Sequence, residues 1–156
     1  QVGVKYGAIS VDHLEQMGME EIEALKGSET MPTVLPGCAF FLNLPLSPVR
    51  DMINAGLPVA MASDFNPGTS PSGNMQFIMS AACIRYKMTP EEAFNATTLN
   101  TAYAMDVSHE LGSITKGKLA NVIITKPMNG LEFMPYYYGA NKVDKVIIKG
   151  KLKVEN

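Results

Sequence analysis

The residues PVAMASDFNPGTSPS, Pro58 to Ser72, carry the clearest structural signal in the chain. The first part, Pro58–Ser63, is almost continuously apolar, which is typical of a strand buried on both faces of a parallel sheet. The second part, Asp64–Ser72, is dense in turn-forming and hydrogen-bonding residues and predicts a loop. A polar loop directly after a buried strand indicates an α/β fold whose working side chains lie at the carboxyl ends of strands.

Strand-like and helix-like segments alternate on the N-terminal side of this stretch. We expect a strand at Val4–Val11, followed by a helix at Met19–Lys26, where apolar residues recur at every third position. A short apolar strand at Thr33–Leu35 is closed by Pro36-Gly37. After a proline-bearing loop, a second helical pattern covers Pro48–Ala55.

On the C-terminal side, helical patterns give way to short strands. A helix is expected at Gln76–Tyr86. Another helix is expected to begin at Thr89 as N-cap and Pro90 as first helical residue. Either this helix continues to Met105, or a further helix follows it up to that residue. From Leu111 onward the chain predicts an all-β module, with strands at Val122–Thr125, Val143–Ile148 and Leu152–Val154.

Repeated strand, loop and helix units are typical of a parallel α/β sheet or barrel. A complete (β/α)8 barrel takes about 250 residues, whereas about three units are visible here. The sequence therefore predicts the last part of a TIM-like barrel followed by a β module. We place the boundary near Val107–Glu110, with the barrel portion in residues 1–108 and the β segment in residues 109–156.

Composition limits the class of protein. The 156 residues include 13 Lys plus Arg and 15 Asp plus Glu, a net charge of −2, so there is no basic excess for nucleic acid. No apolar run approaches the roughly 18 to 20 residues that a membrane span needs.

Cys38 and Cys83 fit neither a zinc-ribbon spacing nor a disulfide scaffold, which favours a reducing cytoplasm. The chain begins at Gln1 with no signal-peptide pattern, and we expect it to be cut from a longer protein.

Asp64 is the first candidate for chemistry. It directly follows the apolar strand and precedes Asn66, Gly68, Thr69 and Ser70, a group of hydrogen-bond donors and acceptors around one carboxylate. Such a carboxylate binds a divalent metal or acts as a general base. The alternative is that Asp64 begins an Asx-turn and that the loop only reverses the chain. The residues themselves leave both interpretations open.

His13 is the second candidate, because it lies at the expected carboxyl end of a strand between Asp12 and Glu15. The alternative is a half-buried histidine whose ring is satisfied by a backbone carbonyl. The other histidine, His109, lies in a polar stretch at the expected domain boundary and is interpreted as a solvated loop residue.

Several segments together resemble the metal-dependent amidohydrolase superfamily, and the loop after the apolar strand resembles the imidazolonepropionase family within it. The resemblance rests on Asp12–Glu15, Ser63–Ser70, Met88–Ala93, Thr98–Asn100, Leu111–Ile114 and Lys116–Lys118. It covers essentially the whole chain. It implies barrel strands six to eight, followed by part of a small β-sandwich.

Enzymes of this family act in histidine degradation, where they hydrolyse the ring of 4-imidazolone-5-propanoate to give N-formimidoyl-L-glutamate. The resemblance implies that Asp64 is a metal ligand and the base for the metal-bound water. It implies that Asn66 and Gly68 contact the formimidoyl-glutamate product and that Thr69 contacts the imidazolone substrate. His13 would lie beside the metal and polarise the ring carbonyl or orient the hydroxide, and Glu15 has no assigned role.

The family's His-x-His pair has no match in this sequence. We therefore expect Asp64 to be the only ligand here of a divalent zinc or iron ion, the others to lie in a missing N-terminal part, and the chain to be inactive alone. The resemblance further implies a small-molecule substrate and a homodimer, while the charge and the lack of a long apolar run argue against a nucleic-acid or membrane partner. The alternatives are an amidohydrolase of another cyclic amide and a non-catalytic α/β interaction module.

Overall fold

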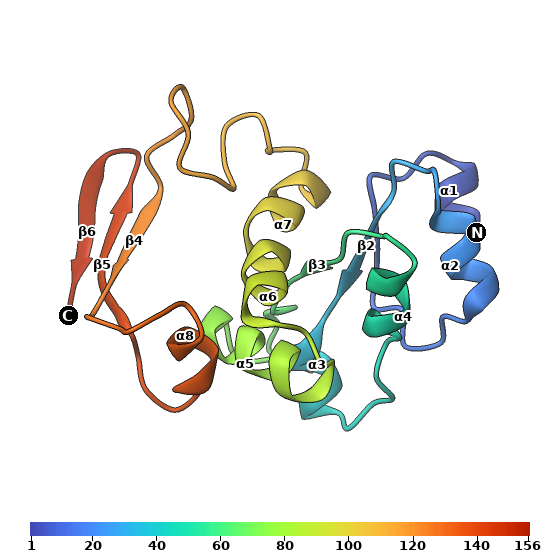
Figure 1. Cartoon of the computed structure of the whole chain (residues 1–156), viewed down its shortest axis with the longest axis horizontal. Coiled ribbons are helices and arrows are strands. Elements are labelled where there is room, and N and C mark those ends of the chain that lie inside the picture. Colours follow the sequence, from blue (N-terminus) through green and yellow to red (C-terminus); the bar gives the residue numbers. More distant parts are fainter.

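The computed structural model describes residues 1–156, which form two sheets joined by a layer of helices (Figure 1). In chain order the elements are α1 (Val2–Lys5), β1 (Ser10–Asp12), α2 (Met19–Leu25), β2 (Met31–Val34), α3 (Pro36–Phe41), α4 (Val49–Asn54), β3 (Ala60–Met61), α5 (Met75–Arg85), α6 (Pro90–Thr97), α7 (Leu99–Ala104), β4 (Val122–Thr125), α8 (Phe133–Tyr136), β5 (Val143–Ile148) and β6 (Lys151–Glu155). No helix combines the length and the apolar character that a membrane crossing needs.

The first sheet is parallel, with strand order β1-β2-β3. Asp12 pairs with Thr33, and Thr33 pairs in turn with Ala60. Helix α2 connects the first two strands, and α3 and α4 connect β2 to β3. Because all three strands run the same way, the segments after Asp12 and Met61 leave from one edge of the sheet. The fold thus brings the two candidate segments of the sequence to a common edge.

Apolar side chains from the sheet and from the helices form one buried cluster. Val34 of β2 and Met61 of β3 are paired neighbours, and they are covered by Ile22 of α2, Ile78 of α5 and Ala93 of α6. Each of these side chains is at most 1% exposed. Full burial of a large aliphatic side chain stabilises a fold by about 1.5–3 kcal/mol. This cluster therefore holds the parallel sheet and its helices together.

Polar contacts cap helix α6 and attach helix α7 to the sheet. The Thr89 side chain accepts a hydrogen bond from the Glu92 N–H, and the Glu92 carboxylate accepts one from the Thr89 N–H, which is a capping box. On α7, Asn100 donates to the Val59 carbonyl at 2.9 Å and the Thr101 hydroxyl donates to the Met61 carbonyl at 3.0 Å. Side chains of α7 thus satisfy the carbonyl of Met61 in β3 and that of the residue just before this strand.

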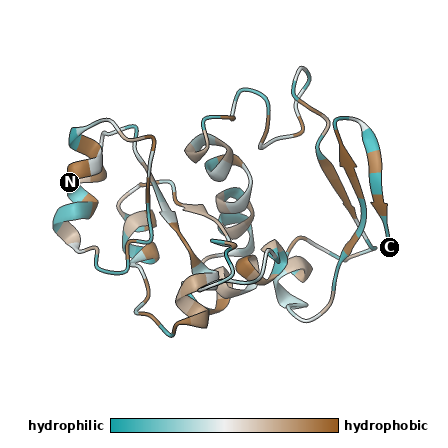
Figure 2. Cartoon of the chain, turned by 180° about the vertical axis from the view of Figure 1, so that it is seen from behind, coloured by the Kyte–Doolittle hydropathy of each residue, from teal (hydrophilic) through white to brown (hydrophobic).

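The second sheet is antiparallel, with strand order β4-β5-β6. Figure 2 shows hydrophobic colouring along much of this sheet beside the C-terminus. Helix α8 lies between β4 and β5 in sequence and packs on α5, where the buried Ser80 hydroxyl donates to the Pro135 carbonyl at 2.6 Å. The antiparallel sheet is thereby attached to the helical layer of the first one.

The structure corrects the sequence expectations in several places. The strand expected at Val4–Val11 is wrong in its first half, where α1 forms and Gly7 reverses the chain at φ 67°. Pro36 begins helix α3 as its first residue, where a missing N–H costs nothing, although we expected it only to close a strand. Of Pro58–Ser63, only Ala60–Met61 is strand. Helix α8 was not predicted.

Candidate functional site

The candidate residues lie where β1 and β3 end, and their backbones are unusual. His13 and Leu14 have φ of 75° and 73°, and Asp64 has φ of 53°. Residues other than glycine seldom adopt these left-handed conformations, which cost of order 1–3 kcal/mol where they are strained. Such conformations cluster at functional sites because the surrounding structure must hold them. Both candidate segments therefore turn sharply away from the sheet at its carboxyl edge.

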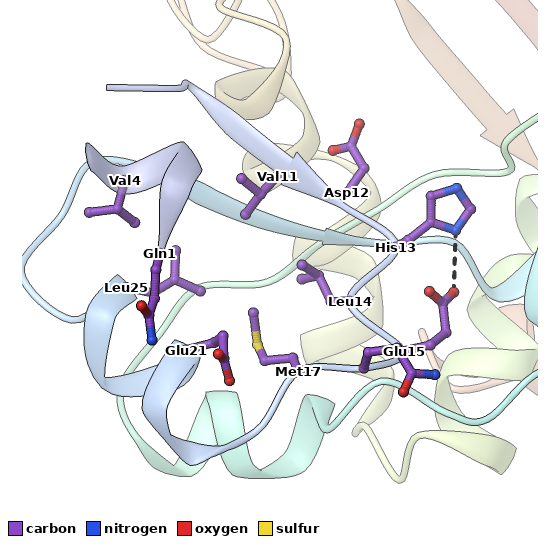
Figure 3. Close-up of a pocket in the computed structure, with 11 residues that line it drawn as sticks. Gln1, Val4, Val11, Asp12, His13, Leu14, Glu15, Met17, Glu21 and Leu25 are labelled. Carbon is purple, nitrogen blue, oxygen red and sulfur yellow. Dashed lines mark hydrogen bonds and ion pairs between the residues drawn. The ribbon is translucent and has the colours of Figure 1, made fainter. Parts of the chain in front are cut away.

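His13 is paired with a carboxylate in the lining of a pocket. Its Nδ1 lies 3.3 Å from Oε1 of Glu15, and the two side chains face each other while Asp12 points away (Figure 3). The pocket has a volume of about 390 Å³ and is lined by both residues together with Val11 and Leu14. The His13 ring is not bonded to a backbone carbonyl, so that interpretation of the sequence was wrong.

The backbone of His13 is held from a distant part of the chain. The hydroxyl of Ser47, in the loop between α3 and α4, donates to the His13 carbonyl at 2.7 Å. Ser47 is buried, and this bond spans a separation of 34 residues in the sequence. Sequence reasoning missed Ser47, because a serine in a loop carries no local signal of such a contact.

The loop after β3 is organised by Asn66. Its side-chain nitrogen donates to the Asp64 carbonyl at 2.7 Å, and its side-chain oxygen accepts from the N–H groups of Gly68 at 2.9 Å and Thr69 at 2.8 Å. The Asn66 N–H donates to the Ser70 carbonyl at 3.0 Å. The Asx-turn of this loop is therefore made by Asn66, and the turn interpretation of Asp64 was wrong.

The Asp64 carboxylate is left out of this network. It accepts no hydrogen bond from a nitrogen or hydroxyl donor of the chain, although its side chain is half-buried. The buried thiol of Cys38 lies beside it. Burial raises the pKa of the Cys38 thiol, a hydrogen bond with Thr69 opposes this, and the charge of Asp64 together with a hydrogen bond to its carboxylate raises the pKa further. Asp64 thus has carboxylate oxygens available for a ligand.

A close contact with α3 fixes the base of the loop. The hydroxyl of Ser70, which is 2% exposed, donates to the Ser63 carbonyl at 2.5 Å. A Cβ atom at Gly37, on the first turn of α3, would lie 2.8 Å from Ser70 Oγ and 2.9 Å from the Ser63 carbonyl oxygen. Only glycine allows this approach. The residue before Asp64 is therefore held between Ser70 and the start of a helix.

The chain does not contain a complete metal site. No group of three or more His, Cys, Asp or Glu side chains is arranged to hold an ion. His109 lies in an exposed turn between α7 and β4. Asp64 is thus one available carboxylate at the sheet edge, with His13 at the end of another strand of the same sheet.

Comparisons with known proteins agree on one family. Residues 42–153 match the family model described as Amidohydrolase family. The chain is 59% identical over 152 residues to an imidazolonepropionase of Flavobacterium johnsoniae, covering 97% of this chain and 37% of the relative. It is 57% identical over 152 residues to that of Christiangramia forsetii, with the same coverage. It is 42% identical over 155 residues to that of Bacillus velezensis, covering 99% of this chain. The chain spans 37% of the length of these relatives.

Solved structures share the fold. An adenosine deaminase of Xanthomonas campestris with bound zinc superposes with a TM-score of 0.84 at 22% identity, covering 94% of this chain and 37% of that protein. The guanine deaminase of E. coli superposes with a TM-score of 0.79 at 16% identity, covering 97% of this chain and 41% of that protein. These structures contain the same arrangement of helices and strands over nearly all of the chain.

Proposed function

Because this chain belongs to the amidohydrolase family, we propose that the protein of which it is part is an imidazolonepropionase. The reaction adds water to the cyclic amide of 4-imidazolone-5-propanoate and opens the ring to N-formimidoyl-L-glutamate. The observation that carries the proposal is the Asp64 loop, where Asn66 and Ser70 hold the backbone by hydrogen bonds and the Asp64 carboxylate is left available. The 59% identity to an imidazolonepropionase supports this choice of substrate over other cyclic amides.

The proposal includes the position of the chain in that enzyme. Residues 1–108 would form the last part of a (β/α)8 barrel, with β1, β2 and β3 as strands six to eight. Residues 109–156 would form a segment of a small β-sandwich. The parallel order of the first sheet and the antiparallel sheet that follows it support this division. The unpaired edge of β1 would pair with a barrel strand from the N-terminal part of the full-length enzyme.

The family implies a divalent metal, zinc or iron. One carboxylate of this chain fits it, because the Asp64 oxygens are free of N–H and O–H donors and carboxylate oxygens are good ligands for such ions. We propose that Asp64 is one ligand and that the others lie outside this chain. A bound metal supplies a water molecule whose pKa is lowered to about 7.

The residues of this chain would then have separate roles in catalysis and in substrate binding. Asp64 would accept the proton of the attacking water, and His13 would contact the same water or the ring carbonyl. Asn66, Gly68 and Thr69 would contact the substrate and product. Because the N–H groups of Gly68 and Thr69 are already bonded to Asn66, the loop would meet the substrate as a preformed surface.

The test is ring opening by the purified full-length protein that contains this chain, followed by NMR of the product. We expect Asp64→Asn to lower kcat by at least about 100-fold with unchanged thermal stability. Asp106→Asn is the matched control, because Asp106 is exposed and has a similar φ of 57°. A wild-type protein that leaves the imidazolone intact would overturn the proposed reaction. Normal turnover by Asp64→Asn would overturn only the role of Asp64 and would leave the proposed reaction standing.

The full-length enzyme is also proposed to be a cytoplasmic homodimer. Light scattering coupled to size exclusion measures its mass directly. Elemental analysis of the same fractions gives the metal content, and we expect one zinc or iron per full-length chain. A chain of 156 residues with one tightly bound metal of its own would contradict the proposed location of the other ligands.

A further inference from the structure

We propose that Glu15 is a positioning residue that fixes the tautomer and the ring orientation of His13; this rests on the proposed function for its catalytic consequence. The Glu15 side chain is 12% exposed, whereas that of His13 is 48% exposed. The carboxylate is therefore the more firmly enclosed partner, and the imidazole reaches from it toward solvent at the edge of the sheet. Figure 3 shows the two side chains facing each other across the turn.

The pairing decides which ring nitrogen carries a proton. A carboxylate has acceptors only, so the Nδ1 atom of His13 must be the donor to Oε1 of Glu15. In the neutral imidazole the other nitrogen, Nε2, then has a lone pair and no proton. Such a ring accepts a hydrogen bond from a water molecule and cannot donate one to a carbonyl oxygen. Of the two roles open to His13, the geometry favours orienting the attacking water.

The backbone keeps the two side chains together. Consecutive left-handed residues, His13 and Leu14, turn the chain so that Glu15 returns toward the ring. Ser47 holds the His13 carbonyl, and Leu14 packs against the buried core cluster. The Met17 N–H closes the turn on the Leu14 carbonyl at 3.1 Å. Three independent contacts thus fix the segment that carries the pair.

The experiment uses the full-length metal-loaded enzyme with the variants Glu15→Ala, Glu15→Gln and His13→Ala and with the double variant of the two alanine changes. We expect Glu15→Ala to lower kcat by about 10- to 100-fold, as for other carboxylates that orient a histidine, with KM changed less than about 2-fold. Glu15→Gln keeps an acceptor oxygen and should retain most of the rate. Glu20→Ala is the control, because Glu20 is an exposed carboxylate on the first turn of α2.

The double variant separates positioning from a merely structural effect. If Glu15 acts through His13, the double variant has the same kcat as His13→Ala, because the histidine is no longer there to be oriented. A further loss of rate on adding Glu15→Ala to His13→Ala would overturn the proposal. So would a wild-type kcat in Glu15→Ala.

Nitrogen NMR of histidine-labelled enzyme provides a readout that needs no substrate. The signal of His13, identified by its absence in His13→Ala, should show protonated Nδ1 in the wild type and a mixture of tautomers in Glu15→Ala. An Nε2-protonated neutral ring in the wild type would overturn the proposal. If this tautomer shift occurs but the wild type does not open the imidazolone ring, the pairing stands and the proposed function fails.

Discussion

Arg50 of α4 binds Glu92 of α6 through two parallel hydrogen bonds. Nη1 lies 3.1 Å from Oε1, and Nη2 lies 2.6 Å from Oε2. The guanidinium also donates to the Lys87 carbonyl, and the Glu92 carboxylate accepts the Thr89 N–H at 2.8 Å. The Glu92 carboxylate therefore caps the N-terminus of α6 and also attaches this helix to α4, through a residue 42 positions earlier in the sequence.

This pair predicts a loss of stability in acid. The hydrogen bond from Arg50 holds the pKa of Glu92 below its ordinary value of 4.5. The Glu92 carboxylate is thus protonated more readily in the unfolded chain than in the folded one. The stability that the pair contributes is therefore complete above pH 4.5 and is lost as the pH falls through the lower pKa of the folded state. We expect a loss of about 1 kcal/mol for this partly exposed pair. Urea unfolding of the full-length protein at pH 7 and at successive values below 4.5 measures it.

Glu92→Gln should remove that component of the acid sensitivity and lower the free energy of unfolding at pH 7. Glu91→Gln is the control, because Glu91 is exposed on the same helical turn and has no ion-pair partner. An identical pH dependence in Glu92→Gln and in the wild type would show that the pair does not contribute.

Gly37→Ala should disturb the loop that carries Asp64. The added Cβ would lie within 2.9 Å of both Ser70 Oγ and the Ser63 carbonyl oxygen, so the loop or α3 must move. We expect a cost of about 1–3 kcal/mol in the free energy of unfolding, and a lower kcat in the full-length enzyme. Gly73→Ala is the control, because no atom lies within 4 Å of its added Cβ. Equal effects of the two substitutions would refute the steric argument.

Gln76→Ala should loosen the attachment of the second sheet. The Gln76 side chain donates to the carbonyls of Tyr137 at 2.9 Å and Ala140 at 2.6 Å, and it accepts the Lys142 N–H at 3.1 Å. Removing it leaves these backbone groups without partners at a cost of about 1–3 kcal/mol. Hydrogen exchange should show faster exchange at Lys142, and not in Gln16→Ala, where an exposed glutamine is lost. Unchanged exchange at Lys142 would contradict the attachment.

Ser47→Ala should release the backbone of His13. The lost bond leaves the His13 carbonyl unpaired beside a buried side chain, at a cost of about 1–2 kcal/mol. Because the turn then orients His13 less firmly, kcat should fall while KM stays close to its wild-type value. Ser108→Ala removes an exposed hydroxyl with no hydrogen bond and should change neither quantity. A Ser47→Ala enzyme with normal stability and rate would contradict this account.

Elements governed by neighbouring residues could be predicted. The start of α6 followed from Thr89, Pro90 and the acids after them, since a capping box is made within one helical turn. Strands β4 and β5 occupy the predicted residues, Val122–Thr125 and Val143–Ile148. The loop after the apolar strand was also correct, because its turn-forming residues act on the backbone next to them.

Elements that depend on distant neighbours could not be predicted in this way. The Pro36-Gly37 pair suits a turn as well as a helix start, and packing of Gly37 against Ser70 and the Ser63 carbonyl accompanies the helix. The loop network centres on Asn66 and leaves Asp64 free, although both residues can make an Asx-turn. Local chemistry permits either choice, and the surrounding contacts select one.

By itself the sequence determined the alternation of strands and helices, the capped helix starts and the polar loops, because these depend on hydrogen bonds and apolar spacing within a few residues. Only the tertiary structure decided that Ser47 meets His13, that Gly37 meets Ser63 and that the Asp64 carboxylate is left available. Those contacts join residues tens of positions apart. They form only when the parallel sheet and its helices pack into one core.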